Sequence, residues 1–267
     1  MAANIRIGAL ISGGGTNLQA IIDGCENGAI DGSMVFVGTD NPDAKGLARA
    51  EKHGIPAFVV DYRSIIREFK ADPAGATPPP DFDLDEITRK QSLIPADADP
   101  ERMATFLKTR AIAEARLLAE MAERPIDLLV LAGFMRNLTP YFIDRFNTDP
   151  HRPRIMNIHP ALLPVFPGVD GYGDTYRYGC KVGGCTVHFI DYGEDSGPII
   201  GQRCFPIEEG DTLDDIKAKG LKLEWQLYPW CIQRFAEDRL RTVKKTYKLD
   251  NGRVMARTVV QVIQEEG

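Results

Sequence analysis

The stretch IRIGALISGGGTNLQAII, residues 5–22, predicts the fold class of the chain. Its first seven residues form a short apolar run, which is typical of a buried strand. The run ends in the glycine-rich turn SGGGTN, and apolar residues then recur at helical spacing at Leu18, Ile21 and Ile22. A strand, a glycine-rich turn and an amphipathic helix in this order indicate the first unit of an α/β fold.

The same alternation continues along much of the chain. Strand-like apolar runs follow at residues 34–40, 55–61, 126–134, 154–158, 184–191 and 197–207, and helical patterns at 44–54, 100–124, 140–146 and 212–235. Strands that alternate with helices at this spacing favour βαβ units and a parallel sheet. We therefore expect an α/β, Rossmann-like fold, with an open, twisted and mostly parallel sheet and helices on both of its faces.

Two segments interrupt or extend this pattern. Residues 62–100 are polar and rich in proline around a short helical pattern, and so long an irregular connection indicates a mobile or functional insertion. Residues 241–267 contain two strand-like runs around the turn DNG, which predicts a β-hairpin that could extend the sheet. The predicted organisation is one α/β domain over residues 1–240, which contains the insertion, and a C-terminal hairpin extension over residues 241–267.

The composition argues against several classes of protein. A net charge of −6 opposes broad nucleic-acid binding, although it is compatible with a local basic pocket for a small anion. The chain contains no run of about 18 apolar residues, so a membrane span is not expected. It opens on the first strand pattern without the layout of a signal peptide, and an odd number of cysteines, five, favours a reducing compartment. We expect a cytoplasmic protein that binds neither nucleic acid nor membranes.

The glycine-rich turn SGGGTN predicts a binding site for a phosphate. The backbone N–H groups of Gly14 and Gly15 and the positive end of the following helix suit an anion, and Thr16 and Asn17 add side-chain donors. A dinucleotide fingerprint would need a third glycine where Leu18 stands, and the Gly-Lys-Ser/Thr ending of a nucleoside-triphosphate loop is missing. A tight turn that needs glycine for its geometry is the alternative, and a site for a monophosphate is favoured.

The stretch RIMNIHPALLPVFPG, residues 154–168, places Asn157 and His159 at the end of an apolar run. Strand alternation points both side chains to the same face, and strand ends in parallel α/β sheets border the crevice where ligands bind. An amide and an imidazole at this position suit a developing oxyanion, which needs two hydrogen bonds aimed at one oxygen. The alternative is a polar pair that caps the strand and fixes the loop.

An acidic loop further along the chain adds carboxylates. The stretch DYGEDSGPII contains Asp191, Glu194 and Asp195 just before a strand. A carboxylate that reaches His159 would favour the charged imidazole and could help to pass a proton. Alone, such a loop is typical of a solvated surface. Together with Asn157 and His159 it completes a set of amide, imidazole and carboxylate.

The remaining histidines and cysteines are weaker candidates. His53 and His151 are expected on the surface, and His188, in a strand, is expected to be buried with one hydrogen bond. Cys180 and Cys185 have no second close pair, so a zinc site is not expected.

Several stretches together resemble the glycinamide ribonucleotide formyltransferases of the folate-dependent formyltransferase family. They are ISGGGTNLQAIID, DLLVLAGFMRNLTP, MNIHPALLPVFPG, GCTVHFIDYGEDSGPII, and GDTLDDI with EWQLYP. They occur in the family's order and cover most of residues 5–60 and 125–236. The Asn-x-His-Pro and Asp-x-Gly-Pro segments are shared by folate formyltransferases generally, whereas SGGGTNLQ is the more specific mark of the ribonucleotide-using branch.

The resemblance implies an enzyme of purine biosynthesis that transfers a formyl group from its co-substrate 10-formyltetrahydrofolate to the amine of glycinamide ribonucleotide. Asn157 and His159 would stabilise the oxyanion, and Asp195 would orient His159 and assist proton transfer. The other residues that the resemblance implies are Gly14, Gly15, Thr16, Asn17 and Glu224 for the ribonucleotide, and Met135, Arg136, Leu138, Asp191 and Glu194 for the folate. It implies no metal or redox cofactor and is compatible with a monomer or a homodimer.

Departures from the family leave the acceptor amine open. Asp170 stands where the family usually has a histidine, and Leu221 where it usually has glutamine or lysine. We expect Asp170 to add negative charge near Asp195 and to raise its pKa. The hairpin tail has no obvious counterpart in the family. The candidates for an arginine that helps to bind phosphate after the third strand are Arg63, Arg102 and Arg110.

Three alternatives remain open. The same folate could serve another phosphorylated amine. A formyltetrahydrofolate hydrolase would need the folate alone, although the phosphate-type turn argues for a second substrate. A nucleotide-binding dehydrogenase, a different class, finds support in Asp40, about 25 residues after the glycines, but gives Asn157 and His159 no role.

Overall fold

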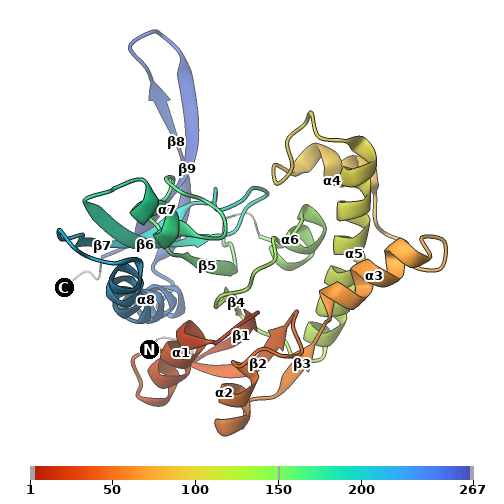
Figure 1. Cartoon of the computed structure of the whole chain (residues 1–267), viewed down its shortest axis with the longest axis horizontal. Coiled ribbons are helices and arrows are strands. Elements are labelled where there is room, and N and C mark those ends of the chain that lie inside the picture. The colour runs from red at the N-terminus through yellow and green to blue at the C-terminus, as the bar shows by residue number, and fades with distance from the viewer. Residues whose placement is uncertain (1–3, 150, 265–267) are drawn as a thin grey trace.

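The computed structural model describes residues 4–149 and 151–264 (Figure 1). Seven strands form one sheet in the order β3–β2–β1–β4–β5–β6–β7. The strands are β1 (Ile5–Ile11), β2 (Gly32–Thr39), β3 (Ala57–Val59), β4 (Leu128–Leu131), β5 (Ile155–His159), β6 (Val182–Phe189) and β7 (Ile199–Pro206). The helices are α1 (Thr16–Glu26), α2 (Leu47–Lys52), α3 (Tyr62–Ala71), α4 (Leu84–Lys90), α5 (Pro100–Ala122), α6 (Pro140–Phe146), α7 (Gly171–Arg177) and α8 (Leu213–Ala236).

The sheet is parallel from β3 to β5 and antiparallel at the other edge, where β6 and β7 join it. The chain leaves β1 toward β2 on one side and returns to β4 on the other, so the strand order reverses between β1 and β4. Ligands of open α/β sheets bind at such a point, outside the carboxyl ends of the strands. The predicted Rossmann-like, mostly parallel fold is confirmed.

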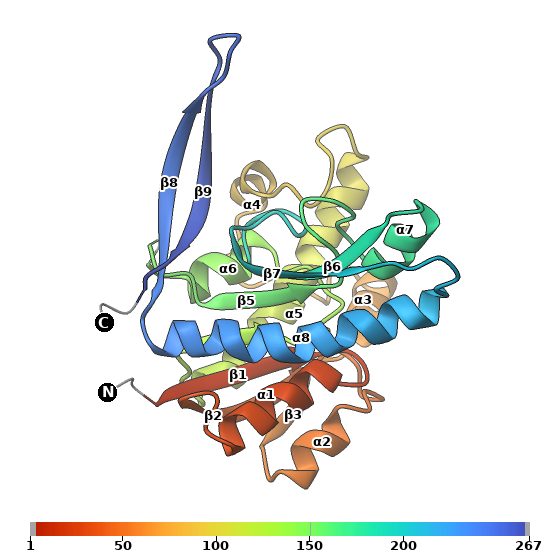
Figure 2. The same ribbon diagram turned by 90° about the vertical axis from the view of Figure 1, so that its left-hand side faces the viewer.

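Helices cover both faces of the sheet. α1 and α8 pack on one face, where Figure 2 shows them side by side, and α5 and α6 pack on the other. Ile7, Ala9 and Ile11 of β1 face the α1 and α8 layer, whereas Leu10 faces the opposite layer. Because both faces of β1 are buried, its apolar run is uninterrupted. Among the helices of the described residues, none has the length and apolar character that a membrane crossing requires.

The insertion is more regular than predicted, because it contains α3 as well as α4. α3 begins after Asp61, whose carboxylate accepts a hydrogen bond from the backbone N–H of Ser64, as a helix cap does. The helix buries Ile65 and Phe69 against the α5 side of the core. The prediction of irregular chain is therefore wrong here: the polar and proline-rich composition of the region concealed an apolar stripe. A further helix, α7, was not predicted either.

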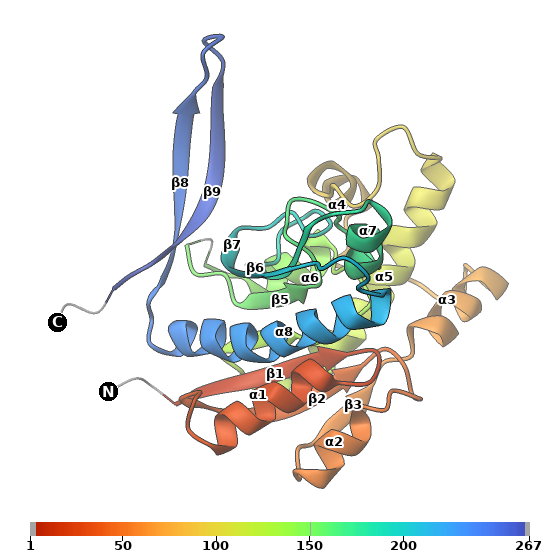
Figure 3. The same cartoon turned by 60° about the vertical axis from the view of Figure 1, so that its left-hand side comes forward.

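The tail forms a hairpin, as predicted, but it does not extend the main sheet. β8 (Leu240–Lys248) and β9 (Val254–Val262) pair antiparallel in a separate two-stranded sheet. The expected extension is wrong because only the base of the hairpin carries apolar residues that pack on the core. The rest projects away from the body (Figures 1 and 3). The last residues of the predicted tail, 265–267, lie outside the described residues, and the division into two domains stays a prediction.

Candidate active site

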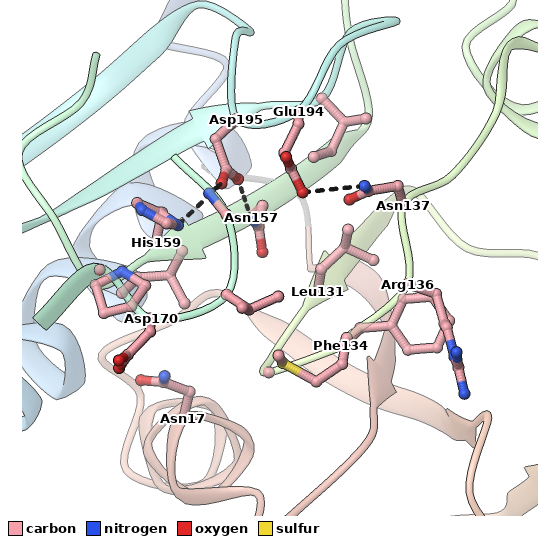
Figure 4. A pocket seen from close by; sticks show the side chains of 18 of the residues that line it. Asn17, Leu131, Phe134, Arg136, Asn137, Asn157, His159, Asp170, Glu194 and Asp195 are labelled. Atoms are coloured by element: carbon pink, nitrogen blue, oxygen red, sulfur yellow. Dashed lines mark hydrogen bonds and ion pairs between the residues drawn. The ribbon is translucent and has the colours of Figure 1, made fainter. Parts of the chain in front are cut away.

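A cavity of about 490 Å³ opens at the carboxyl ends of β4 and β5. The last residues of these strands, Leu131 and His159, both line it. Figure 4 shows Asn157, His159 and Asp195 close together at one end of the cavity and Asn17 at the opposite end. The cavity therefore brings the predicted oxyanion donors and one residue of the glycine-rich turn into a single space.

Asn157 and His159 project from the same face of β5 into the cavity, while Ile158 between them packs into the core. The imidazole Nδ1 of His159 lies 3.1 Å from Oδ2 of Asp195, and its Nε2 lies 2.7 Å from the carbonyl oxygen of Phe166. Both ring nitrogens thus face oxygen acceptors, and either can donate a hydrogen bond when it carries a proton. The predicted contact between His159 and a carboxylate of the acidic loop is present.

Asp195 is fixed by contacts on both of its carboxylate oxygens. Oδ2 also accepts a hydrogen bond of 2.8 Å from the backbone N–H of Gly168, whose φ of 103° requires a glycine. Burial pushes the pKa of Asp195 upward, but the hydrogen bond with His188, the charge of His159 and the Gly168 N–H outweigh it. The net result is a pKa below the ordinary value, so Asp195 is a carboxylate at neutral pH.

His188 belongs to this group, although the sequence predicted only a buried histidine with one hydrogen bond. It is fully buried in β6, directly opposite Asn157 in β5. Its Nδ1 lies 2.9 Å from the carbonyl oxygen of Phe189, and its Nε2 lies 3.3 Å from the amide Nδ2 of Asn157 and 3.5 Å from Oδ1 of Asp195. His188 thus contacts both the amide and the carboxylate from behind the cavity.

A second buried polar network lies at the other end of the cavity. Glu224 of α8 accepts a hydrogen bond of 2.6 Å from Nδ2 of Asn17 on one carboxylate oxygen and one of 2.6 Å from the hydroxyl of Tyr172 on the other. Burial and the neighbouring Glu224 raise the pKa of Tyr172, so its hydroxyl stays a donor. Oδ1 of Asn17 is buried and bonds to no group of the described chain, which leaves an acceptor for a ligand.

Tyr172 was not singled out from the sequence. It lies on α7, two residues after Asp170, and it reaches Glu224 because α8 carries Gly220 at the contact. A Cβ atom at Gly220 would lie 2.1 Å from the Tyr172 hydroxyl oxygen, so a larger residue there would displace the ring. The hydrogen bond between Tyr172 and Glu224 therefore depends on Gly220, and the local sequence around Tyr172 or Gly220 does not predict it.

The glycine-rich turn lies at the edge of the cavity rather than inside it. Asn17 lines the cavity, but Gly14, Gly15 and Thr16 do not, and Thr16 borders a separate groove between α1 and α8. Gly15 caps α1 in the left-handed conformation with φ of 69°, and no side chain caps the first turn of the helix. The first backbone N–H groups of α1 therefore remain available to an anion.

Arg49 of α2 is the cation that lies at this turn. Its Nε donates a hydrogen bond of 3.0 Å to the carbonyl oxygen of Gly14. None of the three arginines considered from the sequence lines the cavity in the described chain. Arg110 is buried in α5 over the ring of Tyr62, and Arg63 and Arg102 are exposed near the starts of α3 and α5.

The segment after β4 forms one wall of the cavity with Met135, Arg136 and Leu138. The side chain of Met135 is 56% exposed. Arg136 turns its guanidinium away from the cavity (Figure 4) and donates from Nε to Asp40 at 2.5 Å. The other carboxylate oxygen of Asp40 accepts from the hydroxyl of Ser12, also at 2.5 Å. Asp40 thus ties this wall to the glycine-rich turn.

The acidic loop forms the opposite wall. Glu194 lines the cavity and accepts a hydrogen bond of 3.2 Å from the amide of Asn137, drawn as a dashed line in Figure 4. Asp191 is not among the lining residues; its carboxylate shapes the loop by accepting from the backbone N–H of Gly193 and the hydroxyl of Ser196.

The insertion reaches this wall. The backbone N–H of Ser92 donates a hydrogen bond of 2.8 Å to the carbonyl oxygen of Tyr192, and Leu93 lines the cavity. No local pattern predicts these contacts, since nothing in a proline-rich segment specifies the distant loop against which it packs. The insertion is therefore part of the cavity as well as of the surface.

Glu114 supports the Met135–Leu138 wall from inside the core. It is fully buried in α5 and accepts hydrogen bonds from the backbone N–H of Thr139 at 2.8 Å and from its hydroxyl at 2.6 Å. Burial raises the pKa of Glu114 to about 7, against the lowering effect of the hydrogen bonds from Thr139. The wall thus rests on a carboxyl group that titrates near neutral pH.

Asp170 does not act on Asp195 as predicted. It lines the cavity, but its carboxylate accepts a hydrogen bond of 2.8 Å from Arg177, which lowers its pKa. The pKa of Asp195 is lowered rather than raised. The expectation was wrong because Arg177, on the same short helix, offsets the charge of Asp170. Leu221 lines the cavity beside the Glu224 network.

The other histidine and cysteine candidates lie outside the cavity. Nδ1 of His53 lies 2.6 Å from a carboxylate oxygen of Glu26, and with Asp23 these form a surface group whose possible ligand atoms lie within 4.8 Å of one another. Cys180 is half-buried and Cys185 is buried, and both are free thiols.

Comparison with known proteins agrees with this arrangement. The family model described as formyl transferase matches residues 5–232. The phosphoribosylglycinamide formyltransferase of Haemophilus influenzae is 32% identical over 245 residues, covering 92% of this chain and 93% of its own length. That of Escherichia coli is 31% identical over 250 residues, covering 94% and 96%. The chain therefore belongs to the formyl transferase family and is a formyltransferase.

A solved structure extends the similarity to the tail. Glycinamide ribonucleotide transformylase 1 from Symbiobacterium toebii superposes with a TM-score of 0.67 at 35% identity, covering 98% of this chain and 95% of its own. An overlap of this extent reaches into the β8–β9 hairpin. The family model itself ends at residue 232, before the hairpin, in agreement with the expectation that the tail has no obvious family match.

Proposed function

We propose that the protein transfers the formyl group of 10-formyltetrahydrofolate to the amine of glycinamide ribonucleotide, as a cytoplasmic enzyme of purine biosynthesis. The observation that carries this proposal is the position of Asn157, His159 and Asp195. They lie in one cavity, between the wall that ends at Leu138 and the network of Asn17 and Glu224. An acyl carrier on one side and a phosphorylated amine on the other would meet at these three side chains.

The reaction itself is an acyl transfer. The amine nitrogen attacks the formyl carbon, a new C–N bond forms, and the formyl oxygen takes the negative charge. The amide of Asn157 and a ring N–H of His159 would donate hydrogen bonds to that oxygen. Asp195 would accept the proton that the amine loses, directly or through water. Collapse breaks the bond between the formyl carbon and N10 of the folate, and N10 takes a proton.

A hydrogen bond from His159 to the formyl oxygen requires a small rearrangement. Nε2 of the ring now faces the carbonyl oxygen of Phe166, and Nδ1 faces Asp195. The Asp195 contact would hold the ring while the Phe166 contact gives way to the formyl oxygen. Phe166 lies in the left-handed region with φ of 56°, which is uncommon for an aromatic residue.

The ribonucleotide would occupy the side of the cavity near α1. The free N–H groups at the start of α1, with Gly14, Gly15 and Thr16, would hold its phosphate. Glu224 would accept from the ribose hydroxyls, held in place by Tyr172. Asn17 would present its unpaired Oδ1 rather than its nitrogen, because Nδ2 already donates to Glu224.

The folate would occupy the side formed by Met135, Arg136 and Leu138 and the backbone of the loop from Asp191 to Glu194. Because Asp40 holds the guanidinium of Arg136, the contribution of Arg136 would come from its backbone. Transfer from an activated carrier needs positioning and charge stabilisation, so the proposal includes neither a metal nor a redox cofactor.

The competing functions fit the geometry less well. A dehydrogenase would use Asp40 for a ribose, but Asp40 is buried and bonds to Arg136 and Ser12. A hydrolase would leave the Glu224 network without a ligand. A different phosphorylated amine as the acceptor is the alternative that Leu221 and Asp170 favour, because both residues line the cavity where the acceptor would bind.

The test is folate turnover with and without glycinamide ribonucleotide, followed by the absorbance of the folate product. Turnover that depends on the ribonucleotide supports the proposal. Turnover in its absence would indicate a hydrolase, and binding of the folate with no turnover in either case would indicate another acceptor amine.

A further inference from the structure

The hairpin of β8 and β9 is an arm that leaves the body of the protein. We define the arm as residues 239–263. Its base packs through Leu240, Val260 and Val262, and the hydroxyl of Thr242 donates to the carbonyl oxygen of His151. Beyond this base the side chains are mostly exposed. An isolated two-stranded hairpin is only marginally stable in water, so a ribbon of this length indicates a partner surface.

The arm is strongly basic. Its charged residues are Arg239, Arg241, Lys244, Lys245, Lys248, Arg253 and Arg257 against the single Asp250, which gives it a net charge of +6. The five cations from Lys244 outward are exposed and form no ion pair within the described chain. Lys245 and Arg257 are directly opposite in the register of the two strands, a like-charge pair that destabilises an isolated hairpin. An acidic partner would remove this repulsion.

Apolar side chains lie beside these cations. Tyr247 pairs with Met255 across the strands, next to the pair of Lys245 and Arg257 on the same face. Tyr247 is 41% exposed and Val254 is 62% exposed. A surface that mixes cations with exposed apolar groups suits a folded acidic protein surface better than a purely anionic polymer.

The insertion supplies such a surface. We define residues 72–101 as the acidic segment, which contains eight carboxylates and only two cations, Arg89 and Lys90, for a net charge of −6. Glu86 pairs with Lys90, and Asp81 with Arg145. The carboxylates that are exposed and have no ion pair within the described chain are Asp72, Asp83, Asp85, Asp97, Asp99 and Glu101.

The two complementary surfaces cannot neutralise each other within one copy as the protein stands. The arm and the acidic segment lie on different sides of the body in Figures 1 and 3. No hydrogen bond or ion pair joins them in the part of the chain that the structure describes. Two arms would repel each other, since each carries +6. On a second copy, the acidic segment offers the arm six exposed carboxylates that have no ion pair within the described chain.

We propose that the arm of one copy binds the acidic segment of a second copy, and that a closed dimer forms with two such contacts. A twofold axis makes the two contacts equivalent, as in most homodimers. The proposal does not rest on the function proposed above. It has a consequence for the cavity, because the acidic segment carries Ser92 and Leu93, which contact the Tyr192 loop and line the cavity. A bound arm would lie against an element of the candidate active site.

The test uses charge reversal and sedimentation velocity of the full chain. At about 20 µM protein we expect a dimer in about 50 mM salt that dissociates toward monomer in about 500 mM salt, since exposed charges are screened. Lys244→Glu, Lys245→Glu, Lys248→Glu and Arg257→Glu together change the net charge of the arm from +6 to −2 and should give a monomer. Asp72→Lys, Asp85→Lys, Asp97→Lys and Glu101→Lys together change the net charge of the acidic segment from −6 to +2 and should do the same. Lys45→Glu, Lys52→Glu, Arg116→Glu and Lys222→Glu, which make the same charge change as the arm variant on exposed residues elsewhere, should leave a dimer.

Mixing provides the decisive control. The arm-reversed and segment-reversed variants should each be monomeric, yet form a heterodimer when mixed, because both contacts then join opposite charges. A chain with both sets of changes, in which the arm is acidic and the segment basic, should again form a homodimer. A wild-type monomer at low salt, or reversals that leave the dimer intact, would overturn the proposal. Monomeric protein that is retained by single-stranded RNA, and released by the arm reversal, would assign the arm to nucleic acid instead.

Discussion

His188 lies directly opposite Asn157 across the antiparallel pair of β5 and β6, and its Nε2 is 3.3 Å from the Asn157 amide and 3.5 Å from the Asp195 carboxylate. This buried ring connects the proposed oxyanion donor to the proposed proton acceptor. It touches no ligand space itself, since it is absent from the lining of the cavity. We therefore regard His188 as a positioning residue for both groups.

Replacement of His188 by asparagine should shift the pH dependence of turnover. The hydrogen bond and charge of His188 help to lower the pKa of Asp195, so their loss should raise it. Because the ionised carboxylate is the active form, the acid limb of kcat should move to higher pH. His151→Asn, on the surface, is the matched control. Superimposable pH profiles for the His188 variant and the wild type would contradict the role.

Removal of the catalytic groups should slow turnover without unfolding the protein. We expect Asn157→Ala, His159→Ala and Asp195→Asn each to reduce kcat by at least about 10²-fold, as loss of an oxyanion donor or proton acceptor does. Asp170→Asn is a matched carboxylate control within the same cavity. It should keep kcat within about threefold, because the Asp170 carboxylate is paired with Arg177 and not with His159. Equal losses in the two aspartate variants would contradict the assignment.

The Tyr172 contact should affect the ribonucleotide side alone. Tyr172→Phe removes the hydrogen bond that holds Glu224, and a charge-assisted bond of this kind contributes about 1.5 kcal/mol or more, so KM for the ribonucleotide should rise roughly tenfold or more. The KM for the folate and kcat should change little. Tyr176→Phe, on the exposed side of the same helix, serves as the control. A raised folate KM in the Tyr172 variant would place the substrates differently.

Glu114 should make stability depend on pH. Its pKa in the folded protein is raised to about 7, so between about pH 4.5 and 7 the folded state binds more protons than the unfolded state. The free energy of unfolding should therefore fall as pH rises through this window, by up to roughly 3 kcal/mol from this group. In Glu114→Gln this decrease in the free energy of unfolding should be absent. Urea unfolding of both proteins across the pH window measures the difference. An equal pH dependence in the two proteins would show that the pKa of Glu114 is not raised.

The sequence indicates those parts of the fold and site that depend on local pattern. The apolar run of β1, the turn before Asn17 and the alternation that aligns Asn157 with His159 are each legible within about ten residues. A contact between the acidic loop with Asp195 and His159 could be predicted because a carboxylate stabilises a charged imidazole. These elements lie where the pattern predicted them, and their catalytic roles stay predictions.

The contacts that escaped prediction are those made between distant segments. His188 meets Asn157 only because β6 pairs antiparallel with β5, a register that alternation alone cannot specify. Tyr172 reaches Glu224 because Gly220 has no side chain that would occupy the space of the ring. Leu93 reaches the cavity because the neighbouring Ser92 forms a β-bridge with Gly193. Each of these depends on which surface packs against which, and that is decided by the whole fold.

The most direct test of the proposed function follows the formyl carbon itself. With 10-formyltetrahydrofolate labelled with ¹³C in the formyl group, and with glycinamide ribonucleotide present, the NMR signal of the label should move to the formamide carbon of the ribonucleotide, at a rate that Asp195→Asn reduces by at least about 10²-fold. Label that appears as free formate, or that stays on the folate while the ribonucleotide is unchanged, would contradict the proposal.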